Sequence, residues 1–185
     1  YLIEKKGSLV HRINAETSGL VLVAKNAFSD MILKNMFEEK LYTKKYKALV
    51  ENEIKEELII NSPITNDTGL IKLKMKTDLK GKESTTIIKP ISYDKEKNQT
   101  LVSAIPLTGR QHQIRVHLAS VGCPILWDNK YWNKQFNAYL SKNLWLTRQA
   151  LHAWKIDFMH YDKDKKMSLE AKIKPDLIKF IDNIK

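Results

Sequence analysis

The chain has 185 residues, 43% of them hydrophobic, a length and composition that suit one globular domain with a sizeable core. Its formal net charge of +11 favours a polyanionic partner such as nucleic acid, and its apolar runs are shorter than the roughly 20 residues that span a bilayer. A single cysteine, Cys123, excludes an intrachain disulfide. We therefore expect a cytoplasmic protein without a membrane segment.

The first quarter of the chain predicts a strand, a helix and a second strand. Residues 20–24 form a continuous apolar run with branched side chains, which predicts a buried strand. A helix capped by Asn26 or Ser29 should follow, because apolar residues then recur at helical spacing. The predicted core-facing residues of this helix are Phe28, Met31, Ile32, Met36 and Phe37. In residues 42–50 apolar residues alternate with lysines, which predicts a strand with one face in solvent.

The middle of the chain predicts β-structure. Residues 71–76 alternate strictly between apolar residues and lysine, the pattern of a half-buried strand. Residues 85–91 and 100–105 are further β-rich runs, separated by turn-like stretches. Because the three runs follow one another along the chain, we expect antiparallel pairing.

The last part of the chain predicts two helices and another strand. Residues 111–121 have helical character that should end at Gly122, where glycine takes positive φ, and before Pro124. Residues 150–158 read as a strand, and residues 176–184 as a short amphipathic helix. The elements show neither a βαβ rhythm nor internal repeats. The predicted class is therefore α+β, one domain built on a mixed, mainly antiparallel sheet with flanking helices.

Two segments concentrate residues suited to binding and catalysis. Residues 11–19 read His-Arg-Ile-Asn-Ala-Glu-Thr-Ser-Gly, and residues 107–117 read Leu-Thr-Gly-Arg-Gln-His-Gln-Ile-Arg-Val-His. Three of the four arginines, Arg12, Arg110 and Arg115, lie in these segments, and a guanidinium can bind a carboxylate or phosphate through paired hydrogen bonds. Since Arg115 lies in an apolar helical register, where an unpaired charge is costly, it should have a functional partner.

Both segments resemble signature motifs of the RluA family of pseudouridine synthases, in which the first reads His-Arg-Leu-Asp and, after two residues, Thr-Ser-Gly. Residues 45–50 resemble the family's Lys-x-Tyr-x-Ala-x-Val strand, and residues 122–131 resemble its Gly-x-Pro-Ile-x-Gly-Asp-x-x-Tyr stretch. Residues 151–153 with Phe158 resemble its penultimate strand. The resemblance implies an α+β domain with a central catalytic cleft, RNA as the partner, either ribosomal or transfer RNA, and neither cofactor nor metal. We expect a monomer.

The chain departs from the family pattern at three places. Asn14 stands where the family has aspartate, and Trp127 stands where it has glycine, which should reshape the loop beside the site. No strand ending in Lys-Pro precedes the first motif. We therefore expect residues 1–185 to form a pseudouridine synthase catalytic domain that lacks its first strand and any RNA-binding domain ahead of it.

The implied reaction breaks the bond between ribose C1′ and uracil N1 and joins C1′ to C5. It needs a carboxylate near C1′, a cation that keeps it ionised and an aromatic face for the flipped base. The resemblance gives these roles to the positions of Asn14, Arg115 and Tyr46. An amide is neutral and a poor nucleophile, so activity should be impaired and Arg115 should face an uncompensated site that attracts anions. Glu16 is not expected to replace the carboxylate.

Other residues of the two motif segments are expected to contact RNA. They are His11, Arg12, Thr17, Ser18, Gly19, Arg110, His112, Gln113, Ile114 and His117. The spacing of the histidines argues against a metal site. Two alternatives stay open: Asn14 as a plain turn residue and Tyr46 as a core aromatic. The leading hypothesis is isomerisation of specific uridines, and the alternative is a catalytically silent RNA-binding relative acting as an RNA chaperone or assembly factor.

Overall fold

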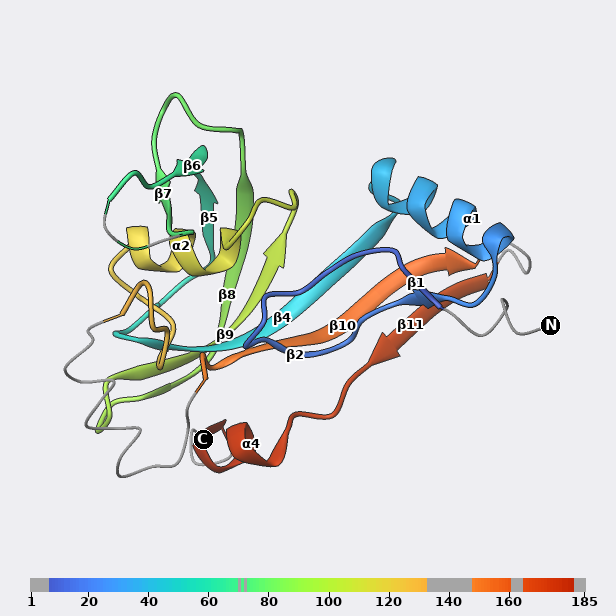
Figure 1. The fold of residues 1–185 in the computed structure, drawn as a ribbon. Helices are drawn as coiled ribbons and strands as arrows, with labels where there is room; N and C mark the ends of the chain where they lie inside the picture. The colour runs from blue at the N-terminus through green and yellow to red at the C-terminus, as the bar shows by residue number, and fades with distance from the viewer. Residues whose placement is uncertain (1–6, 70, 72, 133–147, 161–164, 182–185) are drawn as a thin grey trace.

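The computed structural model of the chain describes residues 7–69, 71, 73–132, 148–160 and 165–181. A long twisted sheet dominates it (Figure 1). Along the sheet the strands follow in the order β11 (Lys165–Glu170), β10 (Leu151–His160), β4 (Tyr42–Glu51), β9 (Gln99–Pro106), β8 (Thr85–Asp94) and β5 (Leu58–Asn61), and β2 (Ser18–Gly19) pairs with β10. Among the described strands of this sheet only β2 and β10 are parallel, so the predicted α+β class with a mixed, mainly antiparallel sheet is confirmed.

Two short ribbons and three helices complete the described fold. The ribbons pair β1 (Ser8–Leu9) with β3 (Val23–Ala24) and β6 (Ile64–Asn66) with β7 (Met75–Thr77). The helices are α1 (Ala27–Glu38), α2 (Gln113–Ser120) and α4 (Pro175–Ile181). In Figure 1, α1 lies near the start of β4 and α2 lies near its far end. None of the helices in the described ranges is both long and apolar enough to cross a membrane.

Helix α1 begins at the predicted cap. The Asn26 side chain accepts a hydrogen bond from the Ser29 backbone N–H at 2.8 Å, and the Ser29 hydroxyl accepts one from the Asn26 backbone in return. The predicted core-facing stripe is only partly right: Met36 is buried, but Phe28 is 55% and Met31 59% exposed. The helix packs against the short strand β3 at one end of the molecule, and the side chains of Phe28 and Met31 keep most of their exposure there.

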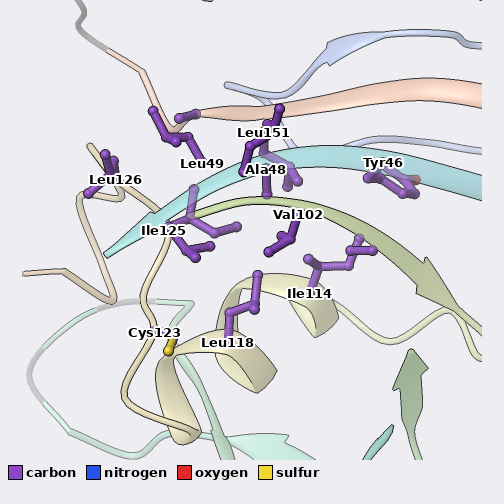
Figure 2. Close-up of a cluster of buried hydrophobic side chains, with 14 of the residues drawn as sticks. Tyr46, Ala48, Leu49, Val102, Ile114, Leu118, Cys123, Ile125, Leu126 and Leu151 are labelled. Carbon is purple, nitrogen blue, oxygen red and sulfur yellow. The ribbon is translucent and has the colours of Figure 1, made fainter. Parts of the chain in front are cut away.

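Strand β4 is the centre of the sheet, and its burial changes along its length. The predicted alternation of buried and wet residues holds in the first half of the strand, whereas Ala48, Leu49 and Val50 are all buried. The segment around Ile125 pairs with the edge of the strand there, as the hydrogen bond from the Leu126 N–H to the Leu49 carbonyl shows. All three side chains belong to the main core. Figure 2 shows Ala48 and Leu49 in the main core, together with Ile114 of α2.

Two predicted strands are much shorter in the structure than in the prediction. In residues 20–24 only Val23–Ala24 is a strand, and Val23 is 48% exposed, because β3 pairs with the two-residue β1 instead of entering the main sheet. In residues 71–76 the strand β7 begins at Met75. Leu73 has φ +58° and is 74% exposed, so the alternation there belongs to a turn. Leu70 and Lys72 lie outside the described residues.

The remaining predictions agree with the structure. Strands β8, β9 and β10 contain the predicted ranges and pair antiparallel within the sheet as expected, although the predicted 150–158 run starts one residue before β10. Helix α2 starts two residues later than predicted and is followed by Gly122 at φ +75°. Helix α4 is present through Ile181, and the rest of its predicted range lies outside the described residues.

Candidate functional site

A pocket of about 100 Å³ lies where the segment 12–17, strand β4 and the segment 106–114 meet. We call it the Asn14 pocket. It collects eight of the residues predicted from the sequence to act in the site, namely Arg12, Asn14, Thr17, Tyr46, Arg110, His112, Gln113 and Ile114. Five others are outside its lining: His11, Ser18, Gly19, Arg115 and His117. The pocket thus unites side chains that are about 100 positions apart in the sequence.

The register of the sheet opens a place for the Tyr46 ring. Tyr46 pairs with Ala104 of β9 on one side and Ala153 of β10 on the other, and these two methyl groups leave room above the strand. The ring is 8% exposed and belongs to the main core as well as to the pocket wall, and burial raises the pKa of its hydroxyl to about 12. The functional and the packing interpretations of Tyr46 therefore both describe part of its environment.

Asn14 lies in a turn that is fastened to the sheet. The Thr17 N–H donates to the Asn14 carbonyl at 2.9 Å, and the Thr17 hydroxyl accepts from the Gln149 amide at 2.7 Å. Ser18 is hydrogen-bonded to His152 at 2.8 Å, which fixes the next residue of the segment. These contacts set the position of Asn14 independently of any ligand.

Gly19 allows the turn to approach β10 closely. It has φ +114°, and a Cβ at this position would lie 2.1 Å from the Ala153 carbonyl oxygen. Ser18 and Gly19 are paired with His152 and Ala153 as strand β2. Ser18 and Gly19 are thus sheet anchors outside the Asn14 pocket, and their contact with RNA stays a prediction.

His11 is also an anchor. Its Nε2 accepts a hydrogen bond from the Leu22 N–H at 2.9 Å, and its ring lies 4.8 Å from the ring of Phe37 in α1. Burial, with a smaller effect of the Lys44 charge, lowers the pKa of His11 to about 4. The imidazole is thus neutral at pH 7, as an acceptor nitrogen requires. It joins the Asn14 segment to α1 from outside the pocket.

The other motif segment is organised by Gln113. Its side-chain oxygen accepts from the Thr108 hydroxyl at 2.7 Å and from the Arg110 N–H at 3.0 Å, while its amide donates to the Thr85 carbonyl at 2.9 Å. The Arg110 Nε donates to the Glu83 carbonyl at 2.9 Å. Gln113 is 4% exposed, so its main action is to hold the loop that presents Arg110 to the pocket.

His112 links the pocket to the loop after α2. It has φ +56°, and its Nδ1 lies 3.0 Å from the hydroxyl of Tyr131. Burial first, and then the charge of Arg115, lowers the pKa of His112 to about 4. A neutral His112 can share a hydrogen bond with Tyr131 without adding charge to the pocket.

Arg115 does not face an empty site, and this prediction was wrong. Its guanidinium forms a bidentate pair with the Asp128 carboxylate at 2.6 and 2.7 Å, and both side chains are buried. The Tyr131 ring lies 5.1 Å from the guanidinium carbon. Asp128 was missed as the partner, although it stands in the stretch 122–131 that matched the family pattern.

His117 cannot contact RNA in this structure, contrary to the prediction. It is 0% exposed and its ring is hydrogen-bonded to Ser84, Thr86 and the Ser62 carbonyl at 2.8 to 3.0 Å. These partners tie α2 to β8 and to the loop before it. The physical reason is helical geometry: position 117 lies on the sheet-facing side of α2.

Lys44 is a pocket residue that the sequence interpretation missed. The signal was present, because in the Lys-x-Tyr pattern the lysine stands two residues before Tyr46, whereas the match was read from Lys45. The Lys44 Nζ lies 5.0 Å from the ring centre of Tyr42 and 5.4 Å from that of Phe37. Burial lowers the pKa of its ammonium group.

The Asn14 pocket is electropositive. Arg12, Lys44 and Arg110 contribute to its wall, and none of the described lining residues is acidic. Glu16 is the acidic residue nearest to Asn14 in the sequence. Its side chain accepts a hydrogen bond from Asn129 at 3.1 Å and is not part of the pocket lining, so it does not bring a carboxylate into the pocket. Within the described ranges no three His, Cys, Asp or Glu residues are grouped so as to hold a metal ion.

Trp127 is not part of the lining of the Asn14 pocket. It has φ +58°, the backbone region that favours the glycine of the family pattern. Its side chain is 4% exposed and packs in the main core, with its ring 4.7 Å from Phe180 and 6.2 Å from Trp132. Its Nε1 has no hydrogen-bond partner among the described residues. The Trp127 side chain, which stands where the family pattern has glycine, is therefore packed in the main core.

The buried histidines predict a loss of stability in mild acid. His11 and His112 have pKa values lowered to about 4, whereas the unfolded chain titrates at 6.5. The unfolded state thus binds more protons between these values. The contribution of the two histidines to the free energy of unfolding should therefore be constant above about pH 7 and fall as the pH drops from about 6.5 to 4.

Urea unfolding at several pH values measures this dependence. His11→Gln and His112→Gln should each flatten the slope, because glutamine does not titrate. A free energy of unfolding that stays constant between pH 7 and pH 4.5 would contradict the account, as would an unchanged slope in the double variant.

Comparison with known proteins agrees with this geometry. The RNA pseudouridylate synthase family matches residues 2–120. Ribosomal large subunit pseudouridine synthase C is 39% identical over 94% of this chain in Vibrio parahaemolyticus serotype O3:K6 and 40% identical over 89% in Rickettsia bellii. The chain spans about half the length of these relatives, 54% and 53% respectively.

A solved structure supports the same fold. Human RNA Pseudouridylate Synthase Domain Containing 1 matches with a TM-score of 0.79 at 23% identity, over 93% of this chain and 72% of that one. Because the family matches more than half of the chain and the motif residues meet in one pocket, the chain belongs to the RNA pseudouridylate synthase family.

Proposed function

We propose that this chain carries the uridine-binding site of an enzyme that isomerises specific uridines of ribosomal RNA to pseudouridine, and that Asn14 leaves this form impaired. The observation that carries the proposal is the convergence of Asn14, Tyr46 and Arg110 on one electropositive pocket. The relatives named for the large ribosomal subunit make ribosomal RNA the favoured substrate over transfer RNA.

The pocket suits capture of a flipped base. The Tyr46 ring and the Ile114 side chain supply apolar surface for uracil, and the cationic residues supply charge for the RNA backbone. Asn14, held by its turn, occupies the place of the group that would act at ribose C1′. Its amide can form hydrogen bonds with the ribose but cannot provide a negative charge, so binding should proceed with little isomerisation.

Arg115 supports this site as a positioning residue in our proposal. Its pair with Asp128 fixes the loop that carries Tyr131, whose hydroxyl is hydrogen-bonded to His112 at the pocket wall. Asp128 also accepts the backbone N–H groups of Lys130 and Tyr131 at 3.0 and 3.2 Å. A substitution of Arg115 should therefore change the shape of the pocket rather than remove a direct contact with the substrate.

The alternative is a natural RNA-binding relative without catalysis, which would act as an RNA chaperone or assembly factor. Asn14 is the observation that favours it. The chain and its Asn14→Asp variant, each incubated with ribosomal RNA from a strain lacking the endogenous enzyme, distinguish the two functions. New pseudouridine with the variant supports the enzyme, and RNA binding by both forms without any pseudouridine supports the alternative.

Substitutions of Tyr46 should separate stacking from packing. Tyr46→Phe keeps the aromatic face and should retain RNA affinity within about two-fold. Tyr46→Ala removes a stacking contact of roughly 1–3 kcal/mol and should weaken binding of a uridine-containing RNA about ten-fold or more. Because the ring is also part of the core, the same variant should lose up to about 3–5 kcal/mol of stability.

Binding measured on the folded fraction, with the melting temperature recorded in parallel, checks this prediction. An affinity that Tyr46→Ala leaves unchanged, with a strongly lowered melting temperature, would show that the ring serves packing alone.

A further inference from the structure

Lys44 has a charge that the described structure does not neutralise. It lies on β4 two residues from Tyr46, so both side chains leave the strand on the same face. None of the ion pairs in the described ranges involves Lys44, and its Nζ contacts the Tyr42 and Phe37 rings at 5.0 and 5.4 Å. A partly buried ammonium group without a carboxylate is costly unless a ligand anion pairs with it.

Two arginines of the Asn14 pocket, Arg12 and Arg110, add to this charge. The Arg12 side chain is exposed, and Arg110 donates through Nε to the Glu83 carbonyl, which leaves its terminal nitrogens for a ligand. Neither arginine belongs to an ion pair within the described ranges. Since no described lining residue is acidic, a volume of about 100 Å³ is bordered by three cations and the neutral Asn14.

The size and chemistry of the pocket select a small, hard anion. Ligand pockets for larger molecules are typically about 300–1,000 Å³. A volume of about 100 Å³ therefore suits a ligand no larger than a single nucleotide. Two guanidinium groups and one ammonium group are the donors that proteins use for phosphate. A carboxylate ligand would need fewer donors than the three available here.

We propose that Lys44, with Arg12 and Arg110, forms a phosphate-binding site that holds the phosphodiester of the captured uridine nucleotide. The assignment of the phosphate to a nucleotide rests on the proposed function. Binding of a phosphate group as such rests only on the geometry and charge of the pocket.

The residue at position 14 should tune this site. Asn14 contributes no charge, so the three cations act together on the anion. An aspartate there would bring a carboxylate into the same lining and compete with phosphate for the cations. Asn14→Asp should therefore weaken phosphate binding about ten-fold.

Calorimetric titration with inorganic phosphate at low ionic strength tests the site. Lys44→Met should weaken binding about ten-fold or more, and Lys44→Arg should retain it within about three-fold. Lys47→Met is the matched control, because Lys47 is also on β4 with its Nζ 4.5 Å from an aromatic ring, that of Trp154, but projects to the other face. It should change binding less than two-fold.

The same variants show whether a loss of phosphate affinity is specific to the Lys44 position. Lys44→Met should fold with unchanged or higher stability, since it removes a buried charge that has no carboxylate partner in the described structure. Unchanged phosphate affinity in folded Lys44→Met would overturn the proposal. An equal loss in Lys47→Met would also overturn it, because the effect would then come from net charge alone.

Titration with uridine 5′-monophosphate and with uridine identifies the source of the phosphate. The nucleotide should bind about ten-fold more tightly than either inorganic phosphate or uridine. Equal affinities for the nucleotide and inorganic phosphate would overturn the assignment to a nucleotide. These titrations use no RNA and no turnover, so a chain that binds phosphate yet makes no pseudouridine after Asn14→Asp would disprove the proposed function and leave the phosphate site standing.

Discussion

Asn14→Asp should raise pseudouridine formation from undetectable to readily measured, by roughly 10³-fold or more. Loss of a nucleophile from an otherwise intact enzyme site costs factors of this order or larger. The turn closed between Asn14 and Thr17 would hold an aspartate in the same place, since the two side chains are nearly isosteric. Arg12, Lys44 and Arg110 would keep the new carboxylate ionised at neutral pH.

Carbodiimide-based mapping of ribosomal RNA from a strain without the endogenous enzyme measures this gain. Asn14→Ala is the control and should stay silent, because it offers neither charge nor hydrogen bonds. Equal pseudouridine yields from the unchanged chain and the Asn14→Asp variant would contradict the assignment of position 14 to the reaction.

Asp128→Ala should destabilise the protein by about 3–5 kcal/mol. The substitution leaves the Arg115 guanidinium buried without its bidentate partner, and a lone buried charge carries the full cost of lost hydration. It also removes the acceptor of the Lys130 and Tyr131 N–H groups.

The Arg148 and Asp176 pair provides a matched comparison. It is also bidentate, at 2.7 and 2.9 Å, but the Asp176 side chain is 40% exposed. Asp176→Ala should therefore cost only about 1 kcal/mol or less. Urea unfolding at pH 7 gives both values. Similar small losses of stability in the two variants would show that burial of the Arg115 and Asp128 pair does not increase the cost of removing Asp128.

The strand pattern was readable from the sequence where strands are long and meet a partner on both sides. The ranges 85–91 and 100–105 belong to neighbouring strands whose pairing satisfies their apolar faces. The range 71–76 has an equally regular alternation, yet of its described residues only Met75 and Lys76 belong to a strand, the short β7 of the ribbon β6–β7. Periodicity reports which face is apolar, and it cannot report whether a partner strand exists.

The motif residues were easier to find than to assign. Membership of a motif identified Asn14, Tyr46 and Arg110, which do meet in the pocket, but it also selected His117, which the fold buries against β8. The exposure of His117 depends on which side of α2 faces the sheet. Similarly, the partner of Arg115 depends on where the chain returns after α2, and no spacing rule brings Asp128 to that position.

The most direct test of the account is a crystal structure of the unchanged chain bound to a short single-stranded RNA that contains uridine. Because Asn14 should prevent turnover, the complex should persist. The account predicts one uridine flipped into the Asn14 pocket, with its base against Tyr46 and Ile114 and its phosphate within hydrogen-bonding distance of Lys44. A complex in which the RNA lies elsewhere on the protein and this pocket remains without a base would contradict it.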